Sequence, residues 1–252
     1  MTLGELLAAA DRAREGHQWH AMAGFLERAA DAVPSEDAAR ALWDQAGEAH
    51  RRDDALDDAA RCLRRALTMS EADTAALASI KLSAVMAECG RLEEAVGWCK
   101  RGLVGAAALV ARDTLVGHLL ALGEVDAARQ WLPPAANGPL GASRAFREAQ
   151  LCRLSGEFSR AEALLDDVLH RLGDLPAVAS ARGATRAERV EICLFTGRAA
   201  EAVRLAEEAM DEQRVGGRRS MAWRAEASRV RALVQAGLTV PQRVLDLSLI
   251  HI

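Results

Sequence analysis

The chain has 252 residues, of which 50% are hydrophobic and 27% charged, and its formal net charge is −4. This composition is typical of a globular protein and excludes a disordered chain. The slight acidic excess argues against a dedicated nucleic-acid-binding protein, which needs a basic stripe, and the longest mostly apolar run, 103–111, is too short to span a bilayer.

Helical periodicity predicts short amphipathic helices along most of the chain, beginning with an N-terminal helix whose acidic residues exclude a signal peptide. The clearest segment is 40–67, where Trp43 and Gly47 share one face of a first helix and Ala59 and Leu63 share one face of a second. The same periodicity predicts first helices of hairpins near 2–15, 36–52, 73–89, 107–122, 141–155, 178–196 and 218–236, and second helices near 18–31, 55–69, 92–103, 125–132, 158–172 and 199–213.

An internal repeat runs through these helices. A turn residue, usually glycine, is followed five positions later by alanine, which lets the two helices of a hairpin approach closely, and the pattern recurs every 33 to 41 residues. The pairs are Gly16/Ala21, Asp54/Ala59, Gly90/Ala95, Gly123/Ala128, Gly156/Ala161 and Gly197/Ala202.

With Trp43, Gly47, Ala59, Leu63 and Ala66 in these positions, the chain resembles a tetratricopeptide-repeat protein, and it is bacterial-looking. The resemblance implies an all-α fold. We expect a right-handed superhelical solenoid of about six degenerate helical hairpins plus a seventh first helix, over residues 1–246.

Two segments interrupt this pattern. The proline-rich stretch 133–140 predicts a break in the solenoid, because proline removes a hydrogen-bond donor and clashes with the preceding helical turn. The last six residues, 247–252, read LSLIHI and resemble a translated sequencing adapter. We interpret them as a non-native tail, which predicts a truncated chain whose native sequence continues after Asp246.

Catalytic and cofactor motifs are absent from the sequence. No GxSxG nucleophile motif and no glycine-rich phosphate loop occurs, and His17 with His20 gives two metal ligands where zinc needs three or four. His50 lies on a helix stripe, where a packed imidazole is expected. The five cysteines are scattered and lack a CxxC pair, which favours reduced thiols and a cytoplasmic protein. We therefore expect no enzyme activity, cofactor or metal.

The resemblance places a binding groove on the first helices, so we expect a protein-interaction scaffold that binds a peptide or helix of unknown identity in the concave groove. The implied groove residues are Asp44, Glu48, Arg51, Ile80, Ala84, Asp113, Phe146, Gln150, Arg153 and Glu191. The chaperone-binding members of the family use a basic clamp, but acidic and apolar residues stand at those positions here.

Other interpretations stay open. The chain could form the regulatory or sensor arm of a larger transcriptional regulator or kinase, or a small-molecule-binding helical domain with a pocket at 133–139. A basic cluster, interpreted as a solvated helix face diluted by acidic neighbours, offers another binding surface. It comprises Arg214, Arg218, Arg219, Arg224, Arg229 and Arg231, with Trp223 among them. Membrane association and nucleic-acid binding are not expected, and the oligomeric state is left open.

Overall fold

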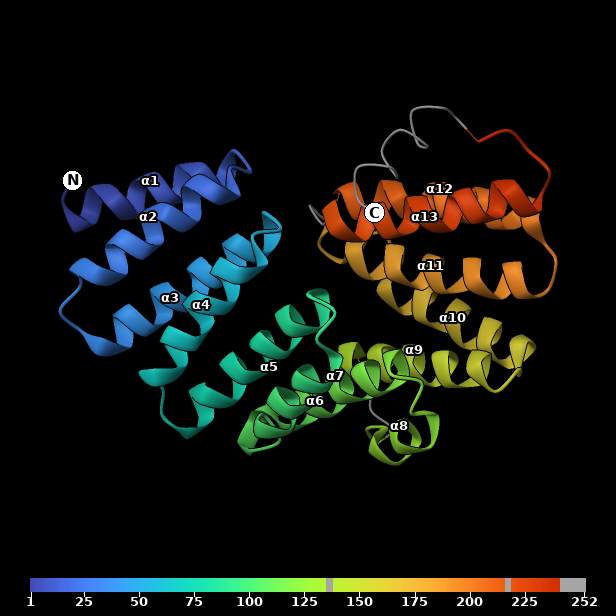
Figure 1. Ribbon diagram of the computed structural model, residues 1–252, viewed down its shortest axis with the longest axis horizontal. Helices are drawn as coiled ribbons and strands as arrows, with labels where there is room; N and C mark the ends of the chain where they lie inside the picture. The colour runs from blue at the N-terminus through green and yellow to red at the C-terminus, as the bar shows by residue number, and fades with distance from the viewer. Residues whose placement is uncertain (135–137, 216–218, 241–252) are drawn as a thin grey trace. The chain divides into compact units, whose positions relative to one another are not determined.

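A computed structural model describes residues 1–134, 138–215 and 219–240, and the suspected tail 247–252 lies outside these ranges. The chain divides into two compact units, an N-terminal unit, Met1–Ala135, and a C-terminal unit, Ala136–Ile252. Within each unit, helices pack against their neighbours in chain order (Figure 1). The described residues contain no β-strand, which confirms the predicted all-α fold.

The helices follow the predicted hairpins closely. The N-terminal unit contains α1 (Leu3–Glu15), α2 (Trp19–Ala32), α3 (Glu36–Arg52), α4 (Leu56–Thr68), α5 (Ala72–Glu88), α6 (Leu92–Arg101), η1 (Gly105–Ala107), α7 (Ala108–Ala121) and α8 (Val125–Trp131). The C-terminal unit contains α9 (Gly138–Leu154), α10 (Phe158–Leu172), η2 (Pro176–Val178), α11 (Ala179–Phe195), α12 (Ala199–Val215) and α13 (Arg219–Gln235). None of these described helices is both long enough and apolar enough to cross a membrane.

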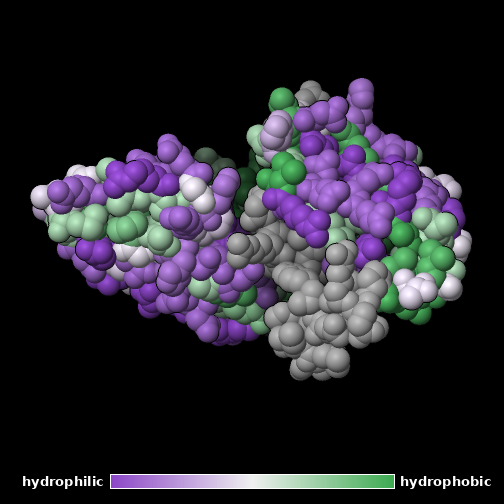
Figure 2. Space-filling view, turned by 90° about the horizontal axis from the view of Figure 1, so that it is seen from above, coloured by the Kyte–Doolittle hydropathy of each residue, from purple (hydrophilic) through white to green (hydrophobic). Residues whose placement is uncertain are grey.

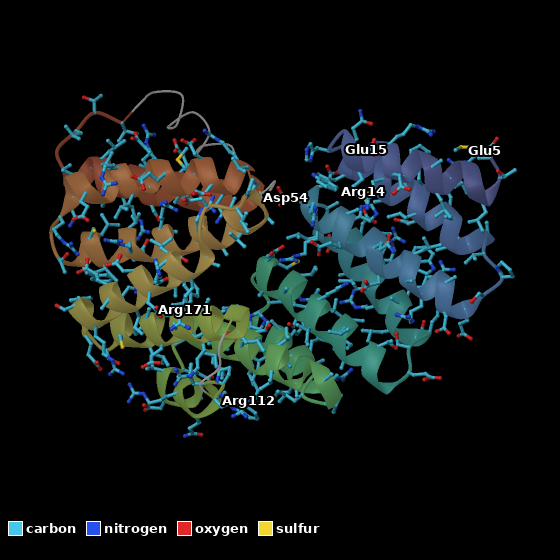
Figure 3. The ribbon with its side chains drawn as sticks, turned by 180° about the vertical axis from the view of Figure 1, so that it is seen from behind. Glu5, Arg14, Glu15, Asp54, Arg112 and Arg171 are labelled. Carbon is cyan, nitrogen blue, oxygen red and sulfur yellow. The ribbon has the colours of Figure 1, made fainter. Side chains whose placement is uncertain are left out.

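One turn geometry joins the two helices of every described hairpin. The residue two positions before each second helix has a positive φ of 55° to 79°, and the next N–H donates to the carbonyl five residues back at 2.8–3.0 Å. This is a Schellman closure, which satisfies carbonyls left open at the end of the first helix. The left-handed residues are His17, Asp54, Gly90, Gly123, Gly156 and Gly197. Asp54 lies at the tip of the α3–α4 hairpin in Figure 3.

This geometry corrects the predicted register of the first hairpin by one residue. Gly16 has φ −82° and ends α1, whereas His17 is the left-handed residue. Met22, rather than Ala21, therefore lies five positions after the turn. Histidine rarely adopts this conformation, so the sequence pattern pointed to the neighbouring glycine instead.

A second correction concerns the proline-rich segment. The α9 helix begins at Gly138, three residues before the predicted start. Pro139 falls in its first turn, where the missing N–H has no intrahelical partner to lose, so the last of the three prolines in the segment starts a helix instead of blocking one. The boundary between the two units falls inside the segment 133–140, at which a break is expected.

Small residues set the distance between helices. A Cβ added at Gly47 of α3 would lie 2.8 Å from Leu63 Cγ of α4, and one added at Gly183 of α11 would lie 2.8 Å from Gln213 Nε2 of α12. Trp43 supplies the bulk of a neighbouring core cluster, where it is buried among alanines of α1, α2, α3 and α4. These close contacts are the packing that the repeat pattern predicts.

Candidate binding surface on the first helices

The predicted groove residues lie on the first helices of successive hairpins. In the N-terminal unit they come from α3, α5 and α7, and in the C-terminal unit from α9 and α11. First helices also contact one another, α3 with α5 and α5 with α7 in the N-terminal unit, and α9 with α11 and α11 with α13 in the C-terminal unit. Most of the predicted polar residues bond to side chains of a neighbouring first helix, and Glu48 and Arg51 also bond to each other.

In the N-terminal unit, two ion pairs join α3 to α5. Asp44 pairs with Lys81, and Arg51 holds Glu88 in a forked contact, with Nη2 at 2.8 Å and Nε at 3.1 Å from the carboxylate. Glu48 accepts a further bond from Arg51 at 3.2 Å. The Arg51 side chain is only 16% exposed. Burial opposes its charge, but the hydrogen bonds and negative charges of Glu88 and Glu48 together outweigh burial and raise the pKa of Arg51.

In the C-terminal unit the same arrangement joins α9 to α11 and α11 to α13. Arg153 pairs with Glu188, which also accepts a hydrogen bond from Gln150 Nε2 at 3.2 Å. Glu191 accepts from Ser228 Oγ at 3.1 Å and pairs with Arg231. We call these contacts between first helices, in both units, the first-helix ladder. It neutralises much of the charge that the sequence assigned to the groove.

The apolar part of the surface differs from the prediction. Ile80 is only 8% exposed and packs against Gly102 at the end of α6, so it offers a partner little area. Leu77, which the sequence analysis missed, is 51% exposed and shares one stripe of α5 with Lys81 and Ala84. The sequence did carry a signal for Leu77, because residues four positions apart share one face of a helix, and Leu77 lies four positions before Lys81.

The remaining predicted groove residues are partly buried. Ala84 and Phe146 are half-buried, and the guanidinium of Arg147 lies 5.5 Å from the centre of the Phe146 ring. Asp113 lies on α7, next to Arg112, whose guanidinium faces the Trp131 ring and which is labelled in Figure 3. Hydrophilic and hydrophobic residues intermingle on the face seen in Figure 2, as expected for short amphipathic helices.

The basic cluster is largely paired where the structure describes it. Arg229 contacts Glu207 and Glu226, each at 3.1 Å, and Arg214 contacts Asp211 at 3.3 Å. Arg218 and the side chains of Arg219, Trp223 and Arg224 lie outside the described residues.

A cleft of about 450 Å³ opens between α4, α5 and α6. Its lining combines an apolar floor with two arginines, Arg64 and Arg101, and the guanidinium of Arg101 stacks over the Trp98 ring at 4.4 Å. The small-molecule pocket predicted at 133–139 falls elsewhere, at the boundary of the two units, where residues 135–137 lie outside the described part.

The cysteines are poorly suited to nucleophilic chemistry. Burial raises the pKa of Cys62 to about 12 and also raises the pKa of Cys89 and Cys193. A thiol with a raised pKa remains protonated at neutral pH, whereas a catalytic cysteine needs the thiolate.

These features define a helical-repeat protein of stacked hairpins whose first helices carry an ordered polar ladder. No family model matches the sequence, and no curated protein matches it. Solved structures do match its fold. A tetratricopeptide repeat protein from Parabacteroides merdae superposes with a TM-score of 0.59 at 15% identity, over 97% of this chain and 96% of that one.

Two further structures agree. The C-terminal part of a TPR repeat-containing protein from Cytophaga hutchinsonii has a TM-score of 0.51 at 11% identity, over 94% of this chain and 97% of that one. Nearly identical TPR-like repeats from Podosopora anserina give 0.53 at 16% identity, over 66% and 92%. At these identities the likeness concerns the fold alone. The chain has the tetratricopeptide-repeat fold, as its resemblance predicted.

Proposed function

We propose that the chain is a non-catalytic protein-interaction scaffold that binds a peptide or helix on the first-helix surface of its N-terminal unit. The observation that carries this proposal is the α5 stripe. An exposed apolar side chain, Leu77, lies four residues before Lys81 and seven before Ala84, and Lys81 pairs with Asp44 of α3. An amphipathic helix presents apolar and charged residues at the same spacing.

The ladder supports this role through rigidity. Asp44–Lys81 and Arg51–Glu88 fix α3 against α5, so the surface needs little ordering when a partner binds. Because these charges are already paired within the chain, recognition rests on shape and on burial of the apolar residues more than on net charge. Covering the exposed half of Leu77 contributes about 1 kcal/mol, so several such contacts are needed for a stable complex.

The experiment uses peptides selected from a random display library on the full chain. We expect their affinity to fall at least about tenfold for Leu77→Asp, because a buried unpaired carboxylate is costly. Leu175→Asp is the matched control, since Leu175 is also exposed but lies in the loop before η2. Circular dichroism must show that both variants are folded. Selected peptides that bind both variants equally well contradict the proposal.

A regulatory or sensor arm of a larger regulator would use the same surface, so this experiment tests the binding step of that alternative too.

The cleft between α4, α5 and α6 favours a second candidate function, binding of a small anionic molecule with an apolar or aromatic part. Neither Arg64 nor Arg101 forms an ion pair with any side chain that the structure describes, and arginines suit carboxylates and phosphates. Arg64→Gln with Arg101→Gln should abolish calorimetric binding of such ligands and leave selected peptides bound.

A further inference from the structure

Three potential metal ligands meet in the N-terminal unit, although they are far apart in sequence. Glu27 comes from α2, His50 from α3 and Cys62 from α4, and their ligand atoms all lie within 4.8 Å of one another. His50 Nε2 is 2.6 Å from Glu27 Oε1, and Cys62 Sγ is 3.5 Å from the same oxygen. We call these residues the Glu-His-Cys triad.

The donor chemistry of the triad fits zinc. Carboxylate, imidazole and thiolate are the ligands that Zn²⁺ takes, and three protein ligands leave a fourth position for water. In a tetrahedral site, the oxygen lies about 3.4 Å from the nitrogen and about 3.6 Å from the sulfur. The sulfur–oxygen distance already agrees. The imidazole and the carboxylate must separate by about 0.8 Å, which rotation of the partly exposed Glu27 side chain can supply.

We propose that the Glu-His-Cys triad is a zinc-binding site that joins the first hairpin to the second. Zinc coordination would then tie α2, α3 and α4 together at one point. On binding, the Cys62 S–H bond is replaced by an S–Zn bond, and the proton passes to solvent.

Burial holds the His50 imidazole in place beside Glu27. The His50 side chain is only 6% exposed, yet its Nδ1 atom is buried and makes no hydrogen bond. Nε2, which faces Glu27, is the nitrogen that would bind zinc, and Nδ1 would remain without a hydrogen bond in the metal-bound state.

Arg61 is the competitor that zinc must displace. Its Nη2 lies 2.9 Å from Glu27 Oε1, but it also lies 3.1 Å from Asp58 Oδ1. The Arg61 side chain is half exposed, so it can turn toward Asp58 when a dication takes the carboxylate. This competition predicts that removing the arginine charge strengthens zinc binding.

The test is titration of the reduced full chain with Zn²⁺ and, as a spectroscopic probe, with Co²⁺. We expect one equivalent to bind, with a thiolate-to-cobalt charge-transfer band and the intense visible absorption of tetrahedral cobalt. Cys62→Ser and His50→Gln should each weaken binding by more than about tenfold, since even loss of an outer-shell partner costs that much. Arg61→Gln should tighten it.

The matched control is Cys193→Ser, which removes another fully buried thiol from the C-terminal unit. It should bind cobalt as the wild-type chain does. Melting curves without metal establish that each variant is folded. The proposal is overturned by an absence of uptake, by a cobalt spectrum without thiolate charge transfer, or by binding that Cys62→Ser leaves unchanged. An Arg61→Gln chain that is destabilised and binds no zinc would show that the triad is only an ion-pair network.

Discussion

Replacing Gly47 with alanine tests the close packing of the hairpins directly. The new Cβ would lie 2.8 Å from Leu63 Cγ and 3.3 Å from the Ala59 carbonyl oxygen. Leu63 is buried in a core cluster with Leu82 and Val85, so a shift of its side chain disturbs other core residues. Overpacking of this kind costs about 1–3 kcal/mol, and the better helix propensity of alanine returns about 1 kcal/mol. We expect a net loss of up to about 2 kcal/mol in the free energy of unfolding.

The control is the same substitution where space is open. A Cβ at Gly24, inside α2, meets nothing within 4 Å. Gly24→Ala should therefore stabilise the chain by about 1 kcal/mol, the gain in helix propensity alone.

Urea unfolding followed by tryptophan fluorescence suits this comparison, because four of the five tryptophans lie in the N-terminal unit. The midpoints of the two variants should move in opposite directions at an unchanged slope. If Gly47→Ala is as stable as Gly24→Ala, then α3 and α4 can separate without cost, and the close-approach argument is wrong.

Three further predictions concern single side chains. Arg51→Lys keeps the charge but loses the forked contact with Glu88, so the unfolding free energy should fall by about 1–2 kcal/mol; an unchanged urea midpoint would contradict this. Burial raises the pKa of Cys193, so its contribution to stability is present below the unfolded pKa, 9.0, and is lost as pH rises through the folded value. Cys193→Ala should therefore lose less stability than wild type between about pH 7 and pH 10, and equal losses would argue against a buried thiol. Phe195 stacks on Phe158 with centroids 6.2 Å apart but remains largely exposed, so Phe195→Ser should cost no more than about 1 kcal/mol by thermal melting. A larger loss would mean that the ring is covered.

The sequence predicted the hairpins well because each one is set locally. Amphipathic periodicity and a turn residue determine where helices begin and end, and those signals lie within about 35 residues. The first hairpin failed because His17 takes a conformation that favours glycine, while Gly16 stands beside it. The preference of glycine for positive φ therefore placed the predicted turn at Gly16, one residue before its actual position at His17.

The ladder contacts were harder to predict because repeat alignment identifies equivalent residues, not touching ones. Ile80 of α5 is the repeat equivalent of Asp44 of α3, yet Asp44 contacts Lys81. Between α3 and α5 the partner lies one position beyond the repeat equivalent, as the Arg51–Glu88 pair also shows. The Glu-His-Cys triad left no local signal at all. Its residues come from three helices, and only tertiary packing brings them together.

The bonds between helices have a consequence for how the chain is made. The side-chain hydrogen bonds between helices described above join positions about one repeat apart or less, and Gln235 reaches the Leu194 carbonyl over 41 positions. A topology with such local contacts folds fast. Each hairpin can therefore form its hydrogen bonds with the neighbouring hairpin soon after both have left the ribosome. Synthesis proceeds at about 5–20 residues per second, so a nascent hairpin waits only a few seconds for the next one to cover it.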